Sequence, residues 1–288
     1  MKRAFITFAV GDEYIRLSEV LKESIQSFSR YPLLIFGVED FDIEYAPDSW
    51  PSGYIYIYKV LSCLKALRQF DQVVWIDNDC IATYNIDKIW DADIEGYPLL
   101  PKHRFQNFKV WPHVKTDYSD PQVMPKGKAK VGVSEGFENS YLQACCMLFD
   151  SGCERFLKEV LSYFDGYDSE CFPYGDESII NLMMWRERSS KNLGDVSLCS
   201  HYFSPYTLDG FIKAADSKQY EMLFDISART EGIDEDGVVL AHGATLARHN
   251  RLGLIENNFD RILFFHGSKS PLMHKRYLTL MQKHASRS

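Results

Sequence analysis

The segment QVVWIDNDCIA, residues 72–82, decides the fold class of this chain. Its first five residues are apolar after Gln72 and rich in β-branched side chains, which predicts a short buried strand. Two carboxylates, Asp77 and Asp79, follow this strand one residue apart. Ligands of an open α/β sheet bind beyond the carboxyl ends of its strands, so we expect both acids to project toward a ligand. Such a pair can hold a hard divalent cation, although Asp and Asn also form turns at strand ends.

The bulk composition is that of a globular α/β protein. The chain has 288 residues, of which 45% are hydrophobic and 25% charged, enough for one large domain or two small ones. A net charge of −8 argues against a general nucleic-acid binder, because phosphate contacts need clustered Lys and Arg. Seven cysteines without a C-x-x-C pair indicate reduced thiols rather than a disulfide framework. With neither a signal peptide nor an apolar run of transmembrane length, we expect a cytoplasmic protein without a transmembrane segment.

Patterns on either side of residues 72–82 predict alternating strands and helices. A strand, a helix with apolar positions every three or four residues, and a second strand open the chain, which favours a parallel sheet. With no linker and no internal repeat, we predict a single domain over residues 1–288. The predicted strands are 4–10, 32–38, 54–58, 97–100, 141–149, 238–240 and 261–265; the predicted helices are 12–30, 59–70, one or two turns in 84–93, a helix capped by Ser151 and Glu154, one over 176–185 capped by Asp176, and a closing helix at about 271–285.

The segment 101–140 concentrates positive charge in an otherwise acidic chain. Lysine, arginine and histidine side chains alternate there with prolines, which predicts a long basic loop inserted into the domain. Two interpretations are open. The loop is either a lid that closes over phosphates or a solvated surface insertion.

A second polar cluster follows the predicted strand 261–265. His266 and Gly267 come directly after it, and Lys269 lies close behind. If this strand and strand 72–76 are neighbours in one sheet, the carboxylates and the imidazole can share a cation while Lys269 faces the anion that the cation carries. Mn²⁺ suits this donor set better than Ca²⁺, because it accepts imidazole together with carboxylates. Such a site would neutralise a leaving diphosphate, whereas a hydrogen-bonded histidine beside a loop is the alternative for His266 alone.

The ordered set of motifs resembles that of GT-A-fold nucleotide-sugar glycosyltransferases, in particular family 8, over most of residues 4–271. Asp77-Asn78-Asp79 after its strand, with Lys59 about one helix upstream, resembles their D-x-D region. Their first strand end, which holds nucleobase and ribose, is matched by Thr7-Phe-Ala9-Val-Gly11-Asp12-x-Tyr14, and their acceptor-side Asn-Ser/Ala-Gly segment is matched by Tyr141-Leu-Gln143-Ala144-Cys145. Their Asp-Gln-Asp-x-x-x-Asn helix start is matched by Asp176-Glu177 and the following Asn181. Their late His/Gly/Lys-Pro element is matched by His266-Gly267-x-Lys269-x-Pro271.

The resemblance implies an α/β protein with the GT-A (Rossmann-like) fold, a central mostly parallel mixed sheet flanked by helices. It implies metal-dependent transfer of a sugar from a nucleotide diphosphate, UDP in this family, to an acceptor hydroxyl with retention. The acceptor, whether glycan, protein or lipid-linked, is not implied. The implied metal ligands for Mn²⁺ or Mg²⁺ are Asp77, Asp79 and His266; the nucleotide contacts are Thr7, Ala9, Tyr14, Lys59, Asp77, Asn78, Gly267 and Lys269; the catalytic and donor-sugar residues are Asp176, Glu177 and Gln143.

Several residues depart from the family pattern. The late His and Lys are more closely spaced than usual, and His242 in Ala-His-Gly is a rival metal ligand. Gln143 replaces the usual Asn, and Glu177-Ser178 replaces Gln-Asp. The alternative functions are a glycoside hydrolase, whose two acids stand about 5 to 9.5 Å apart, and a catalytically degenerate transferase-like domain that binds carbohydrate. A nucleotidyltransferase would show a Gly-rich phosphate loop after its first strand, which is missing here.

Overall fold

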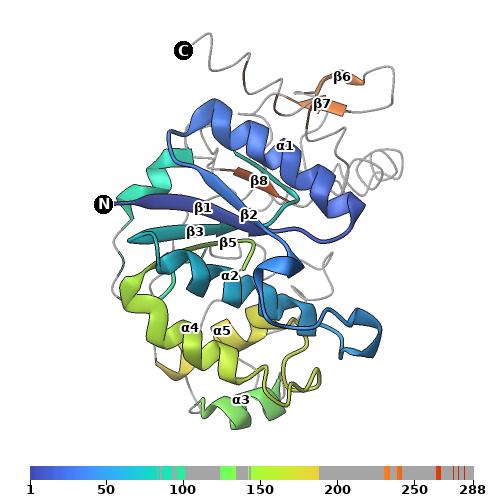
Figure 1. Cartoon of the computed structure of the whole chain (residues 1–288), viewed down its shortest axis with the longest axis vertical. Helices are drawn as coiled ribbons and strands as arrows, with labels where there is room; N and C mark the ends of the chain where they lie inside the picture. Colours follow the sequence, from blue (N-terminus) through green and yellow to red (C-terminus); the bar gives the residue numbers. More distant parts are fainter. Residues whose placement is uncertain are drawn as a thin grey trace. The chain divides into compact units, whose positions relative to one another are not determined.

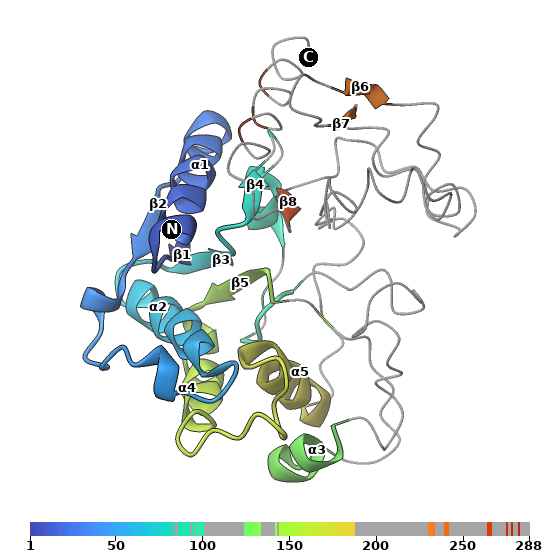
Figure 2. The same ribbon diagram turned by 90° about the vertical axis from the view of Figure 1, so that its right-hand side faces the viewer.

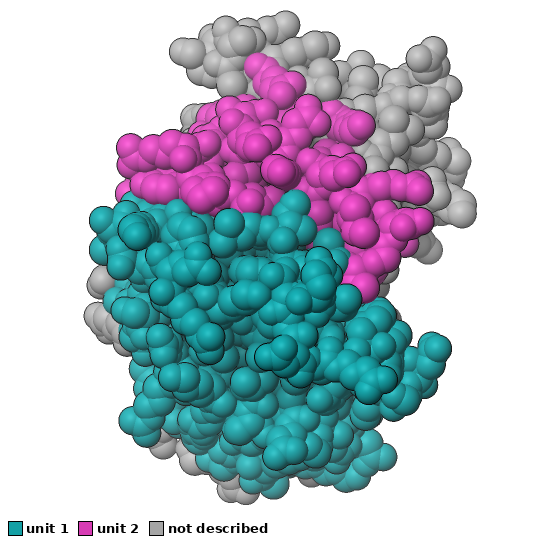
Figure 3. Space-filling model, viewed as in Figure 1, with its two compact units in different colours: residues 1–9, 34–76, 92–195 teal, residues 10–33, 77–91, 196–288 magenta. Residues whose placement is uncertain are grey.

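The computed structural model describes residues 1–82, 84, 86–92, 94, 96–100, 124–133, 142, 144–187, 230–233, 239–241, 264–266, 275, 278 and 282. The chain divides into two compact units, which Figure 3 colours separately. The first unit comprises Met1–Ala9, Leu34–Ile76 and Ala92–Asp195, and the second comprises Val10–Leu33, Asp77–Asp91 and Val196–Ser288.

A four-stranded mixed sheet, in the order β2-β1-β3-β5, forms the centre of the first unit (Figure 1). β1 (Arg3–Phe8) runs parallel to β3 (Gln72–Ile76), β5 (Cys146–Asp150) runs antiparallel to β3, and β2 (Leu33–Phe36) lies on the other side of β1. All five residues of β3 are buried, as expected for a central strand. The predicted bounds of this strand and the predicted α/β class with a mixed sheet are confirmed, and this architecture is consistent with the GT-A fold.

The helices of the first unit pack on this sheet and on one another, as Figure 2 shows. α2 (Ile57–Leu67) lies against β1 and β3, α4 (Glu154–Ser162) packs against α2, and α5 (Asp176–Arg186) contacts both helices. Nearly every residue of α5 is buried. A helix that is buried all round lacks the polar stripe of a surface helix, so the polar residues that α5 does contain need partners inside the protein.

Three local predictions were wrong. Residues 54–58 form no strand but the 3₁₀ turn η3 (Tyr54–Tyr56) and the start of α2, because Gly53, with φ +88°, redirects the chain into a helix. Residues 97–100 make a single bridge, between Leu99 and Leu148, instead of a strand. No side-chain cap forms at Ser151, since η5 (Ser151–Cys153) leads directly into α4.

Two further 3₁₀ turns in this unit are η1 (Val38–Asp40) and η2 (Pro47–Ser49).

Part of the predicted basic loop is the helix α3 (Pro125–Val131), which packs against α5. Its three lysines each contact a neighbour in the first unit. Residues 101–123 and 134–140 of the segment lie outside the described residues. Lys126 pairs with Glu170, the Lys128 ammonium lies 5.9 Å from the centre of the Trp185 ring, and the Lys130 ammonium lies 5.4 Å from that of Phe172.

The close packing of α3 makes Gly127 a sensitive position. A Cβ there would overlap the carbonyl oxygen of Cys171 and lie 2.8 Å from Cδ1 of Leu182. We expect Gly127→Ala to lower the free energy of unfolding by roughly 1–3 kcal/mol, because overpacking a tight contact forces neighbours to move. Urea unfolding measures this loss, and Ala129→Ser, at an exposed position of the same helix, should change stability by less than about 0.5 kcal/mol. Equal stabilities of Gly127→Ala and the unchanged protein would contradict the packing described.

The second unit is built on α1 (Asp12–Phe28), which packs against β4 (Cys80–Ala82) through its apolar face. β4 pairs antiparallel with β8 (Phe264–His266). This unit also contains η4 (Ile86–Asp91) and the antiparallel pair β6 (Thr230–Ile233) and β7 (Val239–Ala241). The closing helix predicted at about 271–285 is described only at Lys275, Leu278 and Gln282. Within the described part of the chain, no helix has the length and hydrophobicity needed to cross a membrane.

Candidate functional site

The two predicted metal-binding acids lie on a tight turn in the second unit. Asp77 directly follows the last residue of β3, and the backbone N–H of Cys80 donates to the carbonyl of Asp77 at 3.1 Å. The side chains of Asp77, Asn78 and Asp79, which we call the acidic turn, are all half-buried. The segment is therefore a turn, and its two carboxylates are partly accessible.

The middle residue of the acidic turn ties it to α1. The side-chain amide of Asn78 donates to Oγ of Ser18 at 3.1 Å, and the Ser18 hydroxyl donates to the carbonyl of Tyr14 at 2.8 Å. Ser18 is buried, and a second buried serine of α1, Ser24, accepts from the backbone N–H of Ala82 at 3.1 Å. Two hydrogen-bonded serines of α1 thus hold the acidic turn before β4 and the last residue of β4. Asn78 has this positioning contact in addition to its predicted role toward the nucleotide.

The strand that carries His266 pairs with the chain just after the acidic turn. In the β4–β8 ladder, Cys80 stands opposite His266, and opposite residues of an antiparallel pair have Cα atoms about 4.5–5.5 Å apart. The condition that this strand neighbours strand 72–76 in one sheet is not met, because β1 and β5 occupy both edges of β3. The backbone of His266 nevertheless lies opposite the residue that follows Asp79. The side chain of His266 and the whole of Gly267, Lys269 and His242 lie outside the described residues.

The acidic turn has the donor chemistry of a hard divalent cation. Asp77 and Asp79 offer carboxylate oxygens, the ligands that Mg²⁺ and Mn²⁺ prefer, and such ions commonly keep water or phosphate oxygens as their remaining ligands. Among the described side chains, no three or more His, Cys, Asp and Glu are grouped to hold a metal. The two acids therefore fit a site that a third protein ligand or the substrate would complete.

A buried ion pair forms the centre of the second candidate region, in the first unit. Lys59 of α2 is only 7% exposed and Asp176 of α5 only 2%. The Lys59 ammonium lies 3.4 Å from Oδ2 of Asp176, donates to the carbonyl of Ala144 at 3.0 Å, and lies 5.2 Å from the centre of the Trp75 ring. An ammonium removed from water needs such partners, because an unpaired buried charge is costly. Lys59, predicted to contact the nucleotide, thus joins α2 to α5 and to the chain before β5.

The ion pair explains why the predicted N-cap role of Asp176 was wrong. Asp176 is the first residue of α5, and the cap position belongs to Gly175, whose φ of +57° suits a glycine. The Asp176 carboxylate turns to Lys59 instead of capping its own helix. One helical turn after Lys59, the buried thiol of Cys63 has a pKa well above its usual range; burial is the main cause, Asp176 adds to it, and Lys59 opposes it. This thiol is therefore neutral beside the ion pair.

Two further side chains of α5 bind the segment that contains the predicted catalytic Gln143. Glu177 Oε2 accepts from the backbone N–H of Ala144 at 3.0 Å. The Asn181 side chain accepts from the N–H of Leu142 at 2.7 Å and donates to the carbonyls of Leu142 and Glu177, each at 2.8 Å. Asn181 is fully buried, so these bonds satisfy its amide. Gln143 itself lies outside the described residues, but both of its neighbours are fixed to the start of α5.

Asn181 is therefore expected to be a structural residue. We predict that Asn181→Leu lowers the free energy of unfolding by about 2–3 kcal/mol, because it leaves both backbone groups of Leu142 buried without their partners. Chemical unfolding in urea tests this value. Gln26→Leu, which replaces an exposed amide on α1, is the control and should have less than about 0.5 kcal/mol effect. A loss as small as that of the control would show that the Asn181 bonds contribute little.

The predicted nucleotide contacts near β1 differ in accessibility. Thr7 and Ala9 are buried, and the Ala9 N–H donates to the carbonyl of Phe36 at 2.9 Å. Within the described part of the chain, the buried hydroxyl of Thr7 has no hydrogen-bond partner. Tyr14, on α1, is 37% exposed. Sequence reasoning named all three, but it missed the structural roles of Lys59, Asn78 and Asn181. For Lys59 and Asn181 the only signal was a polar residue among apolar neighbours.

Comparisons with known proteins find similar structures but no similar sequences. No protein-family model matches the sequence, and no curated protein does either. A glycosyltransferase involved in glycosylation of the major capsid of PBCV-1 is 10% identical, with a TM-score of 0.48 over 96% of this chain and 100% of that one. The apo-form glycosyltransferase GlyE of Streptococcus pneumoniae TIGR4 is 14% identical, with a TM-score of 0.47 over all of this chain and 64% of that one.

A third similar structure is the galactosyltransferase LgtC in complex with donor and acceptor sugar analogs. It is 15% identical, with a TM-score of 0.38 over 62% of this chain and 70% of that one. All three neighbours are glycosyltransferases, but at these identities and TM-scores they do not assign an activity to this chain. Its function is therefore inferred from its own residues.

Proposed function

We propose that this chain is a metal-dependent glycosyltransferase that moves a sugar from a nucleotide diphosphate, with UDP as the favoured carrier, to an acceptor hydroxyl with retention of configuration. The observation that carries the proposal is the acidic turn. It directly follows β3, which is fully buried, and its two carboxylates are half-buried. It continues into β4, in which Cys80 pairs with His266. This arrangement supports a site for a cation and the diphosphate bound to it.

In this proposal, residues of the second unit bind the cation. Asp77 and Asp79 hold Mn²⁺ or Mg²⁺ with His266 as the third protein ligand, and the cation offsets the negative charge that develops on a leaving diphosphate. Asn78 holds the acidic turn against α1 through its bond to Ser18. The remaining proposed contacts, to the diphosphate and to the nucleoside, are Gly267, Lys269, Tyr14, Thr7, Ala9 and Lys59.

Of the two acids at the start of α5, we assign the chemical role to Glu177. The Asp176 carboxylate is buried and paired with Lys59, which suits a structural residue that orients the start of α5. Glu177 is only half-buried and is oriented by the N–H of Ala144. A fixed carboxylate in this position is suited to stabilise the positive charge that forms at the anomeric carbon. Gln143, between two anchored neighbours, is proposed to contact the sugar.

The proposal is tested by nucleotide release from a panel of UDP-, GDP-, ADP- and CMP-linked sugars, with water or simple glycosides as acceptors. We expect release from one carrier only, dependent on Mn²⁺ or Mg²⁺ and abolished by EDTA, with the product anomer identified by NMR. Cleavage of glycosides that persists in EDTA would instead favour the hydrolase. Absence of release from every donor would contradict the proposal.

A further inference from the structure

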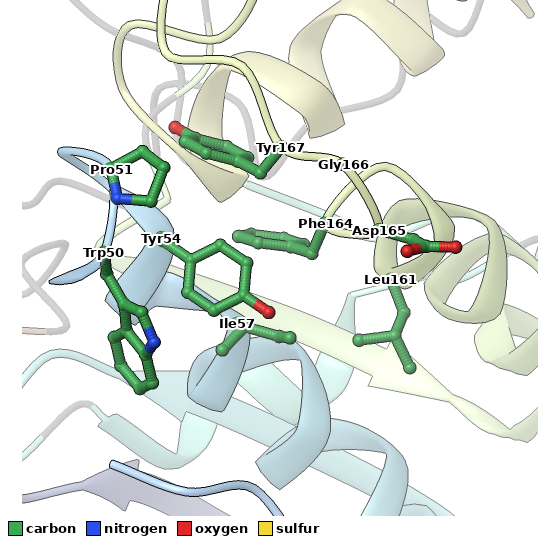
Figure 4. A pocket seen from close by; sticks show the side chains of 9 residues that line it. All are labelled: Trp50, Pro51, Tyr54, Ile57, Leu161, Phe164, Asp165, Gly166 and Tyr167. Carbon is green, nitrogen blue, oxygen red and sulfur yellow. The ribbon is translucent and has the colours of Figure 1, made fainter. Parts of the chain in front are cut away.

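A cavity lined by none of the residues proposed to bind the donor lies within the first unit. A cavity of about 560 Å³ opens between the segment that precedes α2 and the end of α4, as Figure 4 shows. This volume falls in the range of small-molecule sites. The residues that line it are Trp50, Pro51, Tyr54, Ile57, Leu161, Phe164, Asp165, Gly166 and Tyr167.

The wall of this cavity is a set of interlocked aromatic rings. Phe164 and Tyr167 are buried and stack on each other with ring centres 5.3 Å apart. The ring of Tyr54 stands edge-on to both, at 5.9 Å from each, and also to Trp50 at 5.0 Å. Trp50 and Tyr54 remain half-buried. Rigid rings that are packed on one side and open on the other offer apolar contact area at little cost in conformational entropy.

Polar groups that can still form hydrogen bonds surround these rings. The indole N–H of Trp50, the hydroxyl of Tyr54 and the carboxylate of Asp165 have no hydrogen-bond partner among the described residues. In Figure 4 the Tyr54 ring lies between Trp50 and Asp165. The hydroxyl of Tyr167, in contrast, donates to the carbonyl of Phe172 at 2.7 Å, and burial raises the pKa of Tyr167 to about 12. It is a structural donor that stays protonated.

We propose that this cavity binds a neutral pyranose unit of a glycan chain. A pyranose ring has an apolar face of C–H groups, which matches the open rings of Trp50 and Tyr54, and a rim of hydroxyls, which matches Asp165 and the two ring donors. Asp165 is the one charged residue of the lining and it is negative, so phosphorylated or carboxylated sugars would be repelled. The cavity shares no residue with the proposed donor site and binds a glycan without metal.

Isothermal titration calorimetry on the full chain tests this site. The probes are neutral hexasaccharides of glucose, mannose, galactose and N-acetylglucosamine, with a hexamer of galacturonic acid as the anionic comparison. We expect one or more neutral probes to bind with 1:1 stoichiometry in the presence of EDTA, and the anionic probe not to bind. No binding of any neutral probe below about 10 mM would overturn the proposal.

Substitutions locate the bound sugar. We expect Trp50→Ala to weaken binding at least about tenfold through lost ring contact, and Asp165→Asn to weaken it roughly three- to tenfold. Asp165 is exposed, so its substitution leaves the fold intact even if loss of Trp50 does not. Asp42→Asn, at another exposed position, is the matched control and should bind normally, as should Asp79→Asn, which alters only the proposed donor site. Binding unchanged in both pocket variants, or lost in Asp79→Asn, would overturn the assignment.

Discussion

Replacing Asp79 with Asn is expected to lower metal-dependent nucleotide release by roughly 100-fold or more. The substitution keeps the shape of the side chain but removes one of the two charges that would hold the cation, and loss of one electrostatic stabiliser commonly costs this much in rate. Because Asp79 is half-buried on a turn, the variant should fold and melt as the unchanged protein does. Steady-state assays over a range of Mn²⁺ concentrations measure the loss.

The control for this prediction is Asp91→Asn, which replaces an exposed aspartate at the end of η4 in the same unit. It should retain full activity. Excess Mn²⁺ should recover part of the activity of Asp79→Asn if the defect lies in metal affinity. Full activity of Asp79→Asn at low metal would remove the acidic turn from the catalytic site.

Replacing Lys59 with Met is expected to lower the free energy of unfolding by about 3–5 kcal/mol. The Asp176 carboxylate would be left buried without its cation, and breaking a buried pair on one side has this cost. Removing both charges in Lys59→Met/Asp176→Leu should restore much of the loss, because similar-sized apolar residues can replace a buried pair with little penalty. Denaturant unfolding of both single variants and the double variant completes a double-mutant cycle, which gives the coupling free energy between the two positions.

The cycle distinguishes two roles for Lys59. If the lysine mainly joins α2 to α5, the double variant is more stable than either single variant. Additive losses, with no coupling between the two positions, would contradict the structural role and leave the predicted contact with the nucleotide as the main one. Lys158→Met, on the exposed face of α4, is a suitable control because its ion pair with Glu154 is solvated and should contribute less than about 1 kcal/mol.

Features that depend on local sequence were predictable. The bounds of β3 follow from an uninterrupted apolar run that ends at Asp77, and α1 follows from apolar residues on one helical face. Residues 54–58 show the limit of this reasoning. Their alternation of Tyr and Ile matches a strand, but the same side chains serve a helix that follows a glycine turn, and only their tertiary neighbours decide between the two.

Features that depend on distant partners were not predictable. Nothing in residues 261–266 indicates that they pair with β4 rather than β3, since this depends on β5 occupying the free edge of β3. Asp176 in front of a helical pattern looks like an N-cap, yet a lysine 117 positions earlier binds its carboxylate. The aromatic cavity combines residues 50–57 with 161–167, and each stretch alone reads as core or loop.

The central claim, that this chain binds a nucleotide diphosphate through a cation at the acidic turn, is tested most directly by thermal melting. The protein is heated with UDP, GDP, ADP or CDP, each with Mn²⁺ or with EDTA. Binding to the native state at 100 times the dissociation constant adds about 2.7 kcal/mol, which raises the melting temperature by roughly 5–10 °C. We expect this rise with one nucleotide, only with Mn²⁺, and not in Asp77→Asn or Asp79→Asn. No rise with any nucleotide and metal, or an equal rise in EDTA, would contradict the account.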